Sequence, residues 1–103
     1  MNIVFSSSRE GKAVMLALLK DVQLTGVEVE PQYENGTETG FYYINFLCLK
    51  KWGSFPFKIR TIGAFNVGYR GEGPSTLEDV LLSQGFSPEK ASLVYSKVTK
   101  ISR

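Results

Sequence analysis

The chain has 103 residues, of which 43% are apolar and 21% are charged, so it predicts one globular domain with a modest core. A formal net charge of +2 is too small to indicate nucleic-acid binding by itself. The sequence has no histidine and a single cysteine, Cys48, which excludes an internal disulfide, the Ser-His and Cys-His catalytic pairs and most zinc sites. We therefore expect a protein that is not an enzyme and that has no cofactor.

The N-terminal residues 1–5 (MNIVF) lack the basic region and the long apolar core of a signal peptide. No apolar run is long enough to span a membrane, and the single cysteine fits a reducing compartment. We therefore expect a cytoplasmic protein of a bacterium or of a virus-infected cell, with no membrane partner.

The first part of the chain predicts a strand over residues 1–6 and a helix over residues 7–23. Ser7 and Glu10 have the spacing of a capping box. The expected apolar stripe of this helix consists of Val14, Met15, Leu18, Leu19 and Val22. Gly26 is expected to end this segment.

An edge strand is predicted over residues 27–30, because apolar and acidic residues alternate there and Pro31 follows. Asn35-Gly36 predicts a tight turn. Residues 41–51 predict a central strand, since both faces are apolar, and Asn45 is a polar exception that needs a partner if it is buried.

A turn at Trp52-Gly53-Ser54 leads to a strand over residues 55–61, with Phe55, Phe57 and Ile59 on one face and Lys58 and Arg60 on the other. Gly63 marks a bulge or break before a strand-like run over residues 64–67. A helix is predicted over residues 75–84, capped by Ser75 and Glu78, with Leu77, Val80 and Leu81 facing inward and Gly85 at its end. Ser87-Pro88 begins a last helix that is expected to reach Ile101.

This order of elements predicts a single α+β domain over residues 1–103. We expect an antiparallel sheet of about four or five strands, with one N-terminal helix and two C-terminal helices packed on one face.

Residues 68–77 (GYRGEGPSTL) join a strand-like run to a helix, and their three glycines permit backbone angles that side chains forbid. A glycine loop before a helix can present free N–H groups to an anion, and Arg70 adds a guanidinium group. The candidate ligand-binding residues are Gly68, Tyr69, Arg70, Gly71, Gly73 and Ser75, with Arg60 and Lys58. The alternative is a tight structural connection, since the loop has neither the P-loop ending nor the dinucleotide order of glycines.

The segment from Gly63 to Ile101, and above all its run FNVGYRGEGP at residues 65–74, resembles a family of small bacterial and phage proteins of unknown function. That family carries a Gly-Tyr-Gly-Gly-Ser/Thr-Gly-Pro motif before two helices. Arg70 stands where the family has glycine, and Glu72 where it has Ser or Thr. The resemblance implies a shared local structure and a phage origin, and it implies no activity.

Charge is unevenly distributed along the chain. The acidic residues Glu28, Glu30, Glu34 and Glu38 fall in one stretch, and the next charged residues are the basic Lys50, Lys51, Lys58, Arg60 and Arg70. If residues 41–51 and 55–61 form a hairpin, its basic face and aromatic residues would suit a nucleotide or a single-stranded nucleic acid. The alternative is a solvated face whose lysines protect the strand edges.

We predict a non-enzymatic binding protein whose ligand is a phosphate-bearing small molecule such as a nucleotide, held by the loop amides and Arg70 with help from Arg60 or Lys58. Such a site is expected to be completed across a homo-oligomer interface, and a phage protein of this kind would sequester a nucleotide signal of a host defence. One alternative is an interaction module or inhibitor that contacts a host protein through Trp52, Lys50 and Lys51. Another is RNA or single-stranded DNA binding on the basic face.

Overall fold

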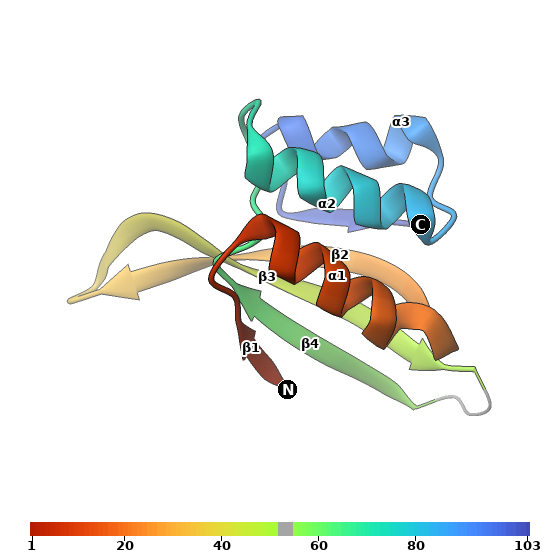
Figure 1. The fold of residues 1–103 in the computed structure, drawn as a ribbon. Coiled ribbons are helices and arrows are strands. Elements are labelled where there is room, and N and C mark those ends of the chain that lie inside the picture. Colours follow the sequence, from red (N-terminus) through yellow and green to blue (C-terminus); the bar gives the residue numbers. More distant parts are fainter. Residues whose placement is uncertain (52–54) are drawn as a thin grey trace.

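The computed structural model describes residues 1–51 and 55–103 (Figure 1). The predicted turn at Trp52-Gly53-Ser54, and with it the predicted contact residue Trp52, lies outside the described residues. The elements in chain order are β1 (Asn2–Val4), α1 (Ser8–Leu18), β2 (Val22–Glu34), β3 (Thr37–Lys50), β4 (Pro56–Ile62), α2 (Glu72–Ser83), α3 (Pro88–Ala91) and β5 (Lys100–Ser102). Two short 3₁₀ turns, Leu19–Asp21 and Ser92–Tyr95, extend α1 and α3.

The strands form one sheet in the order β1-β4-β3-β2-β5. Helices α1, α2 and α3 cover one face of this sheet, and no described helix lies on the other face, which we call the uncovered face (Figure 1). The predicted α+β class and the placement of the helices are confirmed, but the prediction of a purely antiparallel sheet was wrong. Strand β1 pairs in parallel with β4, because α1 carries the chain from β1 across the sheet before β2 begins.

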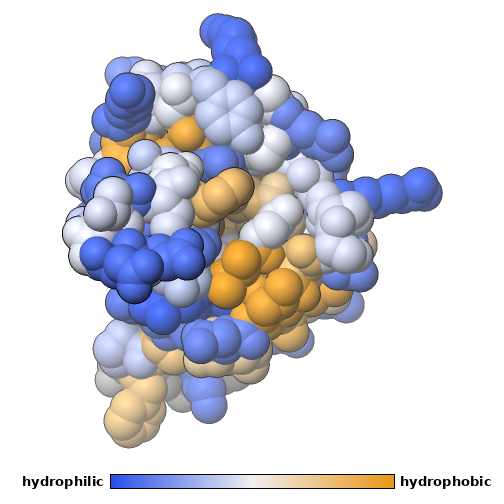
Figure 2. All heavy atoms as spheres, turned by 90° about the vertical axis from the view of Figure 1, so that its left-hand side faces the viewer, coloured by the Kyte–Doolittle hydropathy of each residue, from blue (hydrophilic) through white to orange (hydrophobic). Residues whose placement is uncertain are grey.

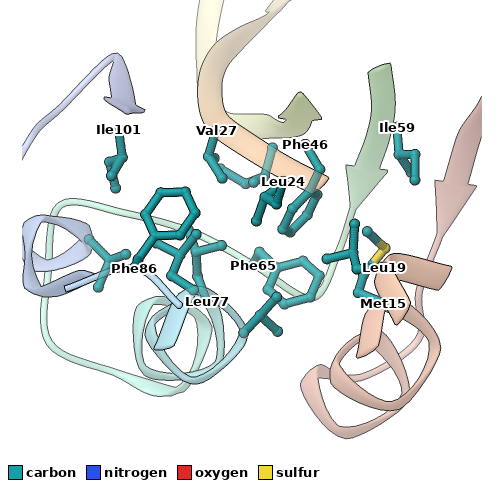
Figure 3. Packing of buried hydrophobic residues seen from close by; sticks show 14 of the residues in the cluster. Met15, Leu19, Leu24, Val27, Phe46, Ile59, Phe65, Leu77, Phe86 and Ile101 are labelled. Carbon is teal, nitrogen blue, oxygen red and sulfur yellow. The ribbon is translucent and has the colours of Figure 1, made fainter. Parts of the chain in front are cut away.

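The core lies between the helices and the covered face of the sheet (Figure 3). Its side chains come from both the helices and the sheet. They include Met15 from α1, Leu19 from the 3₁₀ turn that follows it, Leu77 from α2, and Leu24, Val27 and Phe46 from the sheet. Phe65 packs edge-on against Phe46, with ring centroids 5.2 Å apart. Burying each of these side chains contributes about 1.5–3 kcal/mol to stability.

Helix α1 begins as predicted but ends earlier. The Glu10 N–H donates to Ser7 Oγ at 3.1 Å, which confirms the cap, although the Glu10 carboxylate accepts from the Ser6 N–H. The buried stripe runs through Gly11, Met15 and Leu19. The predicted stripe was wrong at Leu18, which is 38% exposed, and at Val22, which belongs to β2. The buried face of α1 is therefore turned toward Gly11 relative to the predicted stripe. Only glycine fits there, because a Cβ at this position would lie 2.2 Å from the Cβ of Ala64.

Strand β2 begins at Val22, so the predicted end of this segment at Gly26 was wrong. The predicted edge strand over residues 27–30 is also corrected, because β5 pairs with β2 and places Ile101 opposite Val27. The apolar spacing up to Ile101 matched a helical period. The chain nevertheless becomes extended after Tyr95, where Ile101 can fill the core beside β2.

Strands β2 and β3 are longer than their neighbours. β4 pairs with β3 only over Ile44–Leu49, and β5 pairs with β2 only over Gly26–Glu28. Residues 30–43 therefore project as a two-stranded hairpin, which we call the arm (Figure 1). Its tip confirms the predicted turn, with positive φ at Asn35 (53°) and Gly36 (78°).

Gly63 ends β4 and turns the chain toward α2 with a φ of +98°. A Cβ at this position would lie 2.4 Å from the backbone carbonyl oxygen of Phe5. The residues after it, Ala64, Phe65 and Val67, are buried but form no strand, so the strand-like run predicted over 64–67 was wrong. Gly63 thus determines where the loop before α2 leaves the sheet.

We expect Gly63→Ala to lower the free energy of unfolding by about 3 kcal/mol, because it adds a backbone collision to an unfavourable φ. The matched control is Gly36→Ala, which has the same sign of φ but no atom within 4 Å of the added Cβ. This control should lose only about 1–2 kcal/mol. Urea unfolding of both variants measures the difference, and equal losses would contradict the role of the Phe5 contact.

Candidate functional site: the groove beside the arm

The predicted glycine loop leads into α2 earlier than expected. The helix begins at Glu72 with Gly71 as its N-cap residue, so Ser75 lies inside the first turn and donates its N–H to the Gly71 carbonyl at 3.0 Å. The predicted cap formed by Ser75 and Glu78 was therefore wrong. Thr76 Oγ1 instead donates to the Glu72 carbonyl at 2.7 Å.

The loop offers an anion fewer amides than its glycines suggested. The Gly68 N–H already donates to the Val94 carbonyl at 2.9 Å, and Pro74 has no N–H. The carboxylate of Glu72 lies in the first turn of α2, where it already complements the helix dipole. A phosphate would compete with this carboxylate.

Arg70 is engaged beside α2. Its guanidinium carbon lies 4.7 Å from the centre of the Tyr95 ring, and the Tyr95 hydroxyl donates to Glu78 Oε1 at 2.9 Å. This hydrogen bond to Glu78 raises the pKa of Tyr95. Arg70 therefore helps to pack the 3₁₀ turn at Ser92–Tyr95 against α2.

Arg60 and Lys58 lie on the uncovered face of the sheet, so the structure does not bring them together with Arg70. Arg60 Nη2 donates to both carboxylate oxygens of Glu30, at 2.7 and 2.8 Å, and its guanidinium stacks on the Tyr43 ring at 4.5 Å. Lys58 pairs with Glu28 at 3.4 Å. The acids of β2 thus compensate the basic face that was predicted to bind nucleic acid.

Asn45 lies at the centre of this face and is only 1% exposed. Its Nδ2 donates to Glu30 Oε1 at 3.0 Å, which confirms the expected partner. This hydrogen bond, with smaller contributions from Arg60, holds the pKa of Glu30 below its usual range. Asn45 Oδ1 has no hydrogen-bond partner among the described residues.

Lys50 is the last residue of β3, Lys51 follows it, and both are exposed. They lie at the opposite end of this strand from the arm (Figure 1). Their predicted role in a contact at Trp52 stays a prediction.

Two hollows lie where the arm meets the body of the protein, and Tyr42 lines both of them. The first has a volume of ≈ 200 Å³ and apolar walls from Val29, Val67 and Val98. The second has a volume of ≈ 290 Å³ and lies beside Phe41 and Tyr69. We call the two hollows together the groove.

Figure 2 shows this end of the molecule, where hydrophobic residues gather in one area beside hydrophilic ones. Two aromatic side chains that line the second hollow are unusually exposed, Phe41 at 68% and Tyr69 at 48%. The sequence singled out Tyr69 but missed Phe41 and Tyr42. The signal for these two residues is the length of β2 and β3. Both strands continue toward Asn35-Gly36 beyond the part of β3 that pairs with β4.

The starts of two helices also reach the second hollow, α1 at Ser8 and α2 at Gly73. Each first turn contains an acid, Glu10 in α1 and Glu72 in α2. Among the described residues, no charged side chain lines the second hollow, whereas Glu38 and Lys97 line the first. The groove therefore combines aromatic and aliphatic walls with a few polar groups.

Within residues 1–51 and 55–103, no cluster of His, Cys, Asp or Glu side chains could hold a metal ion. The same part of the chain contains no helix with the length and apolar character needed to cross a membrane. Burial raises the pKa of the Cys48 thiol to about 11, so this thiol is protonated near neutral pH.

The shifted pKa of Glu30 predicts how stability depends on pH. Because the folded-state pKa is lowered, the stabilisation is present above the unfolded-state pKa of about 4.3 and is lost as the pH falls through the folded-state value. At pH 7 we expect Glu30→Gln to lose about 1 kcal/mol, a modest figure because the carboxylate side chain is 39% exposed.

Urea unfolding at several pH values measures this loss. The difference between the wild type and Glu30→Gln should shrink as the pH falls below 4, since protonation removes the charge of Glu30 in the wild type as well. Glu89→Gln, on the exposed surface of α3, is the control and should change stability little at any pH. A difference that stays constant with pH would contradict the ionic role of Glu30.

Comparisons with known proteins give no family for this chain: no family model, curated protein or solved structure matches it. The resemblance of residues 63–101 to the family of small bacterial and phage proteins of unknown function therefore stays a prediction, and the groove is interpreted from its own geometry.

Proposed function

We propose that this chain is a non-enzymatic binding protein that holds a polypeptide partner in the groove, with apolar or aromatic side chains of the partner entering the two hollows beside Tyr42. The observation that carries the proposal is the exposure of Phe41 and Tyr69 at the mouth of an apolar hollow. Aromatic residues around such pockets supply most of the binding energy in protein interfaces.

The walls of the groove support a preformed site. They come from the arm, from the segment that crosses from β4 to α2, and from residues 97–99. The crossing segment is held by the buried side chains of Phe65 and Val67, and the Val29 N–H donates to the Thr99 carbonyl at 2.8 Å. A partner would therefore meet walls that are already ordered, which lowers the entropic cost of binding.

A phosphate-bearing ligand is the second candidate. The convergence of the first turns of α1 and α2 on the second hollow favours it, because both helix dipoles point there. The acids Glu10 and Glu72 in these turns oppose it, as does the engagement of Arg70 with Tyr95. The apolar walls therefore favour the polypeptide.

The test is a selection of displayed random peptides on the pure protein, followed by NMR mapping of the recovered peptides on ¹⁵N-labelled protein. We expect the largest shifts at the amides of Tyr42, Tyr69 and Val98. Phe41→Ser and Tyr69→Ser should each weaken binding by about tenfold or more, because each removes an aromatic wall of the second hollow.

The matched control is Phe55→Ser, since Phe55 is 77% exposed but precedes β4, far from the arm along the sheet. This variant should bind the peptides like the wild type. Loss of binding in Phe55→Ser with full binding in Phe41→Ser would refute the groove and favour the interaction surface around Trp52.

The second candidate has its own test, a thermal-shift screen with mononucleotides, dinucleotides and cyclic nucleotides. A ligand present at 100 times its Kd would add about 2.7 kcal/mol and raise the Tm by about 10 °C or more in a domain of this size. We expect no such rise. A rise that disappears in Arg70→Ala would contradict our preference and establish the phosphate-binding loop.

A further inference from the structure

We propose that the partner segment is basic, and that its Lys or Arg residues lie along the arm while its apolar residues enter the groove. This inference rests on the proposed function and adds the chemistry of the partner. It follows from the charges of the arm that the rest of the protein leaves uncompensated.

Residues 22–49 contain glutamates but no lysine or arginine. Two of these glutamates, Glu28 and Glu30, form ion pairs with Lys58 and Arg60 on the uncovered face of the sheet. Glu34 and Glu38 form no ion pair with any described residue. The outer half of the arm therefore keeps its negative charge.

Glu38 connects this charge to the groove, because it lines the first hollow together with the apolar side chains of Val29 and Val98. It also accepts a hydrogen bond from the Tyr33 hydroxyl at 3.4 Å. Tyr33 is 63% exposed, so a flat aromatic face lies next to the carboxylate. A Lys or Arg side chain can contact a carboxylate and an aromatic ring at the same time.

Lys97 lines the first hollow as well, on the wall formed by residues 97–99. Its ammonium would repel a basic residue on that side. The partner must therefore place its basic residues on the arm side and neutral or acidic ones beside Lys97. This pattern of charges gives the bound segment a preferred direction as well as a preferred composition.

Side chains, more than backbone pairing, would bind this partner. On the outer edge of β2, beyond its pairing with β5, Pro31 has no N–H to donate to an added strand. The register of β2 and β3 shifts between Pro31 and Tyr33, and Gly40 has a φ of +86°. Such irregularities prevent a partner strand from extending the sheet along the arm.

The experiment uses two synthetic peptides that share the apolar anchor sequence recovered from the displayed library, one flanked by lysines and one by glutamates. At low salt the lysine peptide should bind wild-type protein at least about tenfold more tightly, and the advantage should decrease at about 0.5 M salt. The double variant Glu34→Lys/Glu38→Lys should reverse the preference. Glu34→Gln/Glu38→Gln should abolish it without reversing it.

Glu89→Lys is the control, because it makes a charge reversal on the exposed surface of α3 and should keep the wild-type preference. Equal affinity of the two peptides, or a preference that survives in the Glu34→Lys/Glu38→Lys variant, would overturn the basic partner and leave the groove intact. Failure of both peptides to shift the groove amides would overturn the proposed function itself.

Discussion

The pairing of β2 with β3 is the interaction on which the rest of the structure depends. It runs from Val22 opposite Lys50 to Glu34 opposite Thr37. Its inner half carries Val27 and Phe46, against which the helices pack, and its outer half is the arm. Since one hairpin supplies both, the position of the arm relative to the body is set by the same core that stabilises the domain.

Charge compensation divides the acids of β2 and β3 into two groups with different consequences. Near the body, carboxylates, Asn45 and the cations of β4 form a network that stabilises the uncovered face and leaves little net charge there. Beyond the last residue of β4 that strand offers no cation, and Glu34 and Glu38 form no ion pair with any described residue. The four glutamates between residues 28 and 38 look alike in the sequence. In the structure, Glu28 and Glu30 form ion pairs on the sheet, whereas Glu34 and Glu38 do not.

Local signals predicted the Asn35-Gly36 turn and the Ser7 and Ser87 caps, because each depends on neighbours in the chain. Of the central strand predicted over residues 41–51, only Ile44–Leu49 has a paired strand on both sides. Errors arose where distant contacts decide. Ile101 has helical spacing, but it lies in β5 because this segment pairs with the edge of β2. The face of α1 that is buried includes Gly11, because the helix packs closely against Ala64 there. The candidate site residues Arg60 and Arg70 were grouped by charge, and only the sheet topology reveals that they lie apart.

The short strand β5 has a consequence for any attempt to reproduce the groove in a smaller peptide. The residues just before it, 97–99, form one wall of the groove, and their place depends on the seating of Ile101 beside Val27. The groove is therefore a discontinuous surface, assembled from Ser8, the arm, the segment between β4 and α2, and residues 97–99. A peptide copied from the arm alone would reproduce the aromatic and acidic groups but would lack the opposing wall.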